Sequence, residues 1–123
     1  MKHYHHIALG CALILTCVIP CEAETTIEAH RNTGEALRDA DAVLNEAYKE
    51  LMAERDETQQ EALRQPQRAW IQYRDACVTA EGSLYEGGSF QPVVELQCAL
   101  DLTTEQTGRL RALMPEAVAA RQA

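Results

Sequence analysis

Histidine and strand-forming patterns are scarce in this sequence of 123 residues, and each scarcity excludes a class of chemistry or fold. The chain has four histidines, and three of them (His3, His5 and His6) lie at its very start. His30 alone remains for the rest of the chain, which leaves little room for Ser/His/Asp or Cys/His nucleophilic catalysis. No stretch alternates apolar and polar residues with period two, so a β-sheet is not expected.

Motifs for phosphate, cofactor and metal binding are missing as well. Gly87-Gly88 is too short to form a phosphate-binding loop, and there is no C-x-x-C pair. Paired carboxylates such as Asp39 and Asp41 are typical of a solvated face in a chain this acidic. We therefore expect no enzyme, no cofactor and no metal site.

Residues 1–23 have the pattern of a signal peptide. Lys2 precedes an apolar run from Ile7 to Ile19, which is shorter than the roughly 20 residues of a membrane span. Cys21 and Ala23 place small residues at the −3 and −1 positions of a cleavage site after Ala23. We predict a signal peptide at 1–23 and a mature domain at 24–123. A retained membrane anchor is the less favoured alternative.

Cleavage changes which cysteines count. Cys11, Cys17 and Cys21 would leave with the signal, although lipidation at Cys17 or Cys21 is a minority alternative. Cys77 and Cys98 would then be the two cysteines left in an oxidising compartment. We predict a disulfide between them, which contributes about 3 kcal/mol by the chain-entropy model. A redox-active or metal-binding pair is disfavoured because no second ligand pair accompanies it.

Apolar residues recur at three- and four-residue steps in three segments, about 33–54, 57–81 and 91–114. This periodicity predicts an all-α fold, a small bundle of three main helices. Pro66 predicts a bend or a fresh start within the second helix, and Pro92 suits the first turn of the third, which Ser89 or its neighbour could cap. Trp70 and Tyr73 are the largest side chains expected in the core.

Residues 24–32 are polar, and they either fray or extend the first helix. Three glycines within residues 82–89 predict a loop between the second and third helices, flanked by the two cysteines. Arg74 lies on the inner side of its helix by spacing, so we predict that it reaches Asp41 or Asn45 on the first helix. A structural ion pair is favoured over a direct functional role for this arginine.

Taken together and in order, four short motifs resemble the LprI-like lysozyme inhibitor family over roughly residues 34–113. They are Asp-x-x-Leu-Asn, Gln-x-x-Trp-x-x-Tyr-Arg-Asp, Gly-Gly-Ser and Cys-x-x-x-x-Thr. The residues that carry the resemblance as structural motif positions are Asp41, Asn45, Trp70, Tyr73, Arg74, Asp75 and Thr103. The resemblance implies a helical fold, periplasmic or secreted residence, and inhibition of lysozyme.

The resemblance implies a protein partner. A basic lysozyme fits this role, because a chain of net charge −8 is attracted to a basic surface. The same charge argues against nucleic acid and anionic membranes. The alternative is an envelope binding or immunity module that neutralises another toxin or serves an envelope complex. The glycine-rich loop is the predicted binding element; the alternative is that it only connects two helices. The predicted binding residues are Ser83, Tyr85, Glu86, Gly87, Gly88, Ser89 and Phe90.

Overall fold

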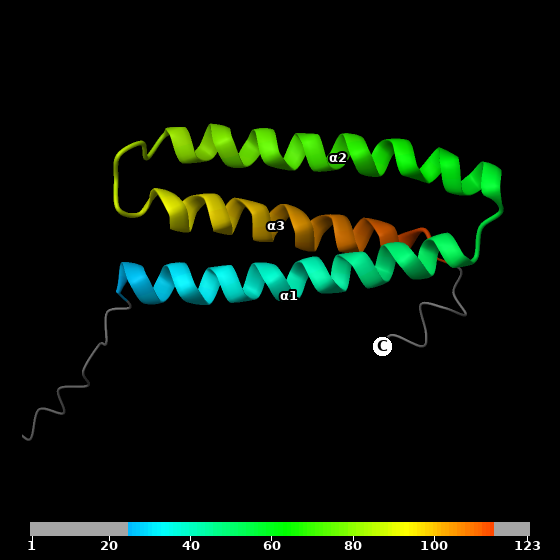
Figure 1. Cartoon of the computed structure of the whole chain (residues 1–123), viewed down its shortest axis with the longest axis horizontal. Helices are drawn as coiled ribbons and strands as arrows, with labels where there is room; N and C mark the ends of the chain where they lie inside the picture. The colour runs from blue at the N-terminus through cyan, green and yellow to red at the C-terminus, as the bar shows by residue number, and fades with distance from the viewer. Residues whose placement is uncertain (1–24, 115–123) are drawn as a thin grey trace, which may run out of the picture.

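The computed structural model describes residues 25–114 and shows three long helices in this range, as predicted. Helix α1 spans Thr26–Ala53, α2 spans Glu57–Ser83 and α3 spans Gln91–Ala112 (Figure 1). The signal peptide and its cleavage site lie outside the described residues, as does the end of the chain from residue 115. Their assignments therefore stay predictions.

Helix α1 begins one turn or more before the apolar periodicity does, because a capping box starts it. The Thr25 hydroxyl accepts a hydrogen bond from the Glu28 backbone amide, and the Glu28 carboxylate accepts one from the Thr25 amide. These contacts satisfy backbone donors that a helix N-terminus otherwise leaves unpaired. The polar residues 26–32 therefore extend the helix. Hydrogen bonds donated by the Thr25 amide and hydroxyl favour the ionised carboxylate and lower the pKa of Glu28.

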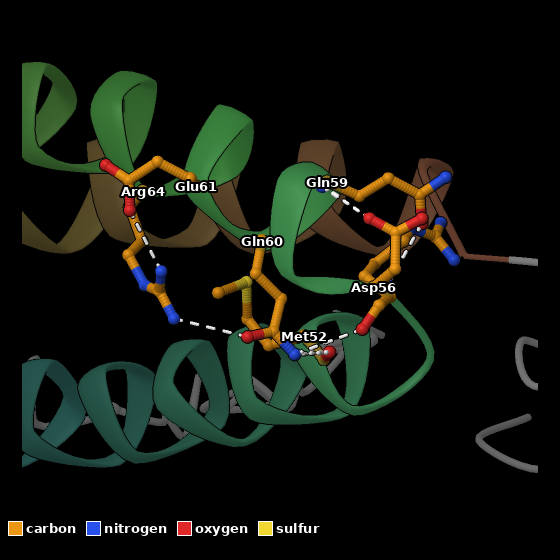
Figure 2. A network of polar contacts seen from close by, with 7 residues as sticks. Met52, Asp56, Gln59, Gln60, Glu61 and Arg64 are labelled. Carbon is orange, nitrogen blue, oxygen red and sulfur yellow. Dashed lines mark hydrogen bonds and ion pairs between the residues drawn. The ribbon is translucent and has the colours of Figure 1, made fainter.

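A short turn joins α1 to α2, and a second capping box fixes it (Figure 2). The Asp56 carboxylate accepts from the Gln59 amide at 2.9 Å, and the Gln59 side chain accepts from the Asp56 amide. The Gln60 side-chain amide donates to the carbonyl oxygens of Met52 and Arg55. It thereby ties the first turn of α2 to the end of α1 and the turn after it.

Helix α2 runs without interruption through Pro66 to Ser83, so the predicted fresh start at this proline is wrong. The helix also ends later than predicted, since Gly82 and Ser83 belong to its last turn and not to the loop. Gly82 is buried against the Glu95 side chain of α3, and a Cβ at residue 82 would lie 2.6 Å from Glu95 Cγ. A glycine is therefore needed at residue 82 because α2 approaches α3 closely there, and not because the chain turns.

Helix α3 begins at Gln91 with Pro92 in its first turn, as predicted. Of the two predicted cap positions, Ser89 and its neighbour, the N-cap residue is the neighbour, Phe90, and no side chain bonds there. The Phe90 carbonyl instead accepts from the amides of Val93 and Val94. The helix therefore starts from backbone contacts alone.

Helices α1 and α3 run in the same direction, and α2 runs antiparallel to both (Figure 1). Both α1 and α2 pack mainly against α3. The main apolar cluster lies towards the α1–α2 turn, with Tyr48, Leu63 and Trp70 packed around it. Its buried members are Leu44, Ala47, Leu51, Leu110 and Met114. Within residues 25–114, no helix has the length and apolar character needed to cross a membrane.

One core prediction is wrong. Tyr73 is 58% exposed, whereas Trp70 is half-buried against the main cluster. Arg74, the next residue, occupies the inward position on this turn of α2 and is half-buried. Successive residues of a helix are about 100° apart, so an inward Arg74 turns Tyr73 towards solvent.

Candidate functional site

Arg74 lies where all three helices meet. Its Nη1 donates to Asp41 Oδ1 of α1 at 3.1 Å and to Thr103 Oγ1 of α3 at 3.2 Å. Its guanidinium also covers the Trp70 ring at 5.1 Å from the centroid. The predicted contact between Arg74 and the first helix is therefore confirmed, with Asp41 as the partner; Asn45 is exposed.

The contacts of Arg74 have the character of a structural ion pair. Thr103 is fully buried at 0% exposure, so its hydroxyl depends on partners within the protein. Asp75 adds a second carboxylate 3.5 Å from Arg74 Nε. The guanidinium is thus shared among two carboxylates, a hydroxyl and an aromatic face, which leaves little of it for a ligand.

Cys77 and Cys98 are both free thiols, so the predicted disulfide is not formed. Each thiol interacts with a different neighbour: Cys77 with the Tyr73 hydroxyl, and Cys98 with the Glu81 carboxylate. Burial, then the hydrogen bond to Glu81, raises the pKa of Cys98 to about 11. The hydrogen bond to Cys77 likewise raises the pKa of Tyr73. Facing helices bring the thiols into mutual electrostatic influence but not into a bond.

The segment 84–90 between α2 and α3 is a series of hydrogen-bonded turns. The Gly88 amide donates to the Tyr85 carbonyl at 2.9 Å, and the Gln91 amide donates to the Gly88 carbonyl at 3.2 Å. Gly87 has a φ of 76°, a left-handed conformation that glycine adopts without strain, and its amide donates to Gln91 Oε1. These contacts hold the segment in one shape.

This segment, which we call the tip, presents apolar side chains to solvent. Leu84 is 80% exposed, Tyr85 50% and Phe90 49%. Glu86 and Ser89 are exposed beside them, whereas the Ser83 hydroxyl is taken by the Ala80 carbonyl at 2.6 Å. Leu84 was missed by the sequence-based prediction, although an apolar residue inside a glycine-rich loop is itself a signal.

A groove of about 320 Å³ is lined by residues of all three helices and reaches Pro92, two residues after the tip ends. We call it the α1/α2 groove. Apolar side chains line it, and charged side chains, Arg74 among them, lie along it. The apolar residues are Leu37, Val78, Pro92, Leu96 and Ala99. A groove between helices is a common place for binding sites.

The residues described by the structure hold no cluster of three or more His, Cys, Asp or Glu side chains placed to bind a metal. Of the predicted solvated pair, Asp39 is exposed on the surface of α1, whereas Asp41 is half-buried and paired with Arg74, so the solvated-face prediction is wrong for Asp41. The tip and the α1/α2 groove are the two surfaces near the segment that the sequence predicts for binding.

Comparison with known proteins identifies the family. The model of the family described as "Lysozyme inhibitor LprI" matches residues 17–110, which is most of the chain. An uncharacterized protein of Rhizobium meliloti (strain 1021), R02472, is 30% identical over 129 residues, covering 86% of this chain and 93% of that protein. No solved structure matches significantly. The ordered motifs, the helical bundle and the family match agree, and the chain belongs to the LprI lysozyme inhibitor family.

Proposed function

We propose that this protein is a secreted or periplasmic inhibitor of lysozyme-like muramidases that acts by protein–protein binding. Membership of the family supplies the class of function. The observation on this chain that carries the proposal is the tip, where Tyr85 and Phe90 stand half-exposed on hydrogen-bonded turns. Aromatic anchors on a rigid support are typical of the residues that dominate binding energy.

The tip suits insertion into a concave active site. A muramidase cleft carries two carboxyl groups on either side of the sugar bond that it cleaves, together with polar groups that hold the sugar rings. Tyr85 and Phe90 would replace sugar rings in this cleft, and the hydroxyl of Ser89 would meet a carboxylate. Because its backbone hydrogen bonds are already made, the tip loses little conformational entropy on binding.

The net charge of the chain supports the same partner. A protein of charge −8 is attracted over a distance to a basic enzyme, and this attraction raises the association rate more than it raises affinity. Export would place the inhibitor where muramidases act on the cell wall.

An inhibition assay on a basic muramidase tests the proposal. Wild-type protein at micromolar concentration should inhibit cell-wall lysis, and the double variant Tyr85→Ala/Phe90→Ala should inhibit at least tenfold less. The matched control is Val43→Ala/Ile71→Ala, which removes two other half-exposed apolar side chains from α1 and α2. An inactive wild-type protein would contradict the proposed function. Equal loss in both double variants would instead contradict the role of the tip.

A further inference from the structure

The α1/α2 groove combines an apolar lining with an excess of negative charge. Asp41, Asp75 and Glu95 contribute three carboxylates, against the guanidinium of Arg74 and the imidazole of His30. Arg74 is bound to Asp41 and lies next to Asp75, so these two carboxylates already have a cation. Glu95 lies apart from this arrangement.

Within residues 25–114, the hydrogen-bond partner of the Glu95 carboxylate is a neutral side chain. Its Oε1 accepts from the Gln91 side-chain amide at 2.9 Å, and it makes no ion pair with a described residue. It is also half-buried, and Gly82 packs against it from α2. A half-buried carboxylate without a cation favours a positively charged group brought by a partner.

The apolar lining determines the shape of the group that fits. Leu96 and Val78 lie along the same groove as Glu95 and offer hydrocarbon surface. Lysine and arginine combine a chain of methylene groups with a terminal cation, and they bury the stem while the charged end meets an acceptor. A simple metal ion or an ammonium ion would leave the apolar lining unused.

We propose that the α1/α2 groove receives a lysine or arginine side chain of the protein partner, with Glu95 as the acceptor of its charge. The stem lies against Leu96 and Val78, and the cation meets the Glu95 carboxylate. The groove borders Pro92, two residues after the tip ends, so one partner can contact the tip and the groove together. This inference rests on the proposed function in that it names a second contact of the same partner.

The test compares two variants that each remove one negative charge from α3. Glu95→Gln keeps an oxygen that accepts from Gln91. Asp101→Asn is the matched control, because Asp101 also accepts from a glutamine, Gln97, but is exposed and does not line the groove. Binding to a basic muramidase is measured by surface plasmon resonance. We expect Kd to rise at least tenfold for Glu95→Gln and less than threefold for Asp101→Asn.

A second measurement needs no muramidase. N-acetyl-arginine methylamide is titrated into isotopically labelled protein, and N-acetyl-citrulline methylamide serves as its uncharged analogue. We expect the arginine probe, and not the citrulline probe, to shift the NMR amide signals of Val78, Leu96 and Ala99. The shift should disappear in Glu95→Gln and persist in Asp101→Asn.

The two measurements separate the two proposals. Wild-type protein that neither binds nor inhibits muramidase, but shows Glu95-dependent shifts with the arginine probe, would contradict the proposed function and support the groove as a binding site for a cationic side chain. Wild-type protein that inhibits muramidase, with both variants binding it alike and no arginine-specific shift, would overturn the groove proposal only. Melting temperatures of the variants, measured by circular dichroism, show that each is folded.

Discussion

Arg74 connects three helices through one side chain. Its guanidinium is shared between Asp41 of α1 and Thr103 of α3, and Trp70 covers its face. An arginine provides several donors in one plane, so it can serve two helices at once, whereas lysine has a single charged nitrogen. Arg74 therefore holds together helices α1 and α2, which otherwise pack mainly on α3.

We predict that Arg74→Ala lowers the free energy of unfolding by about 2 kcal/mol, because it leaves the buried Thr103 hydroxyl without its donor and Asp41 without its cation. Urea denaturation followed by circular dichroism measures the change. Arg38→Ala, which removes an arginine from an exposed i,i+3 pair, is the control and should change stability by less than about 0.5 kcal/mol. An unchanged midpoint for Arg74→Ala would refute the structural role.

The Cys98 thiol gives stability a dependence on alkaline pH. Its pKa of about 11 in the folded protein lies above the ordinary value of 9.0, so the folded state holds the proton more tightly than the unfolded state does. Stability from this group is complete below pH 9 and is lost as pH rises towards 11, by an amount of the order of 2 kcal/mol. Thermal melts between pH 8 and 11 should show a steeper decline for wild type than for Cys98→Ala. Parallel curves of melting temperature against pH would contradict the contribution of the Cys98 thiol.

At the scale of elements, the two capping boxes differ in their surroundings. Asp56 begins α2 inside a network that also involves Gln60 and the end of α1 (Figure 2). The side-chain hydrogen bonds of Thr25, in contrast, are with Glu28 in the first turn of its own helix. A capping interaction contributes most where the helix end is held in place, because an end that frays already lacks the contact for part of the time.

Accordingly, Asp56→Ala should destabilise the protein by about 1 kcal/mol, whereas Thr25→Ala should cost less than about 0.5 kcal/mol. Chemical denaturation of both variants under one set of conditions measures the difference. Equal effects would mean that the start of α1 is held as firmly as the α1–α2 turn.

The sequence predicts the helices better than it predicts their ends. Apolar spacing identifies all three helices, and the spacing of Arg74 identifies its pairing with Asp41. The start of α1 was also readable, since Thr25 and Glu28 form the Thr-x-x-Glu pattern of a capping box. The prediction assigns Gly82 to the loop, but a glycine is needed at this position because the Glu95 side chain packs against it. No local sequence pattern shows such a tertiary contact.

The candidate site was predicted only in part. The tip lies between α2 and α3 as expected, because glycine-rich segments between helices form turns. The α1/α2 groove depends on how far α1 and α2 lie apart, and the Cys77–Cys98 separation depends on the register between α2 and α3. Helical periodicity shows which face of a helix is apolar but does not determine the spacing or register of neighbouring helices.

At the scale of the whole molecule, the net charge of −8 should control how fast a basic muramidase is bound. Raising the salt concentration from about 0.05 M to 0.5 M should lower the association rate constant by about tenfold, because screening shortens the reach of the attraction. The dissociation rate constant, which the proposed binding mode assigns to apolar contacts of the tip, should change far less. Stopped-flow or surface plasmon resonance measures both. A salt-independent association rate would exclude electrostatic steering.

The main apolar cluster and the tip lie at opposite ends of α3, since Leu110 and Met114 are in the cluster and Phe90 ends the tip. Substitutions at the tip therefore remove few buried contacts, and most of them should leave the fold intact. Evolution could alter the surface that recognises a partner while the opposite end keeps the chain folded. Under the proposed function, the inhibitor could thereby follow changes in its target enzyme. Relatives should then differ most at the exposed residues of the tip outside its Gly-Gly-Ser motif, namely Leu84, Tyr85, Glu86 and Phe90.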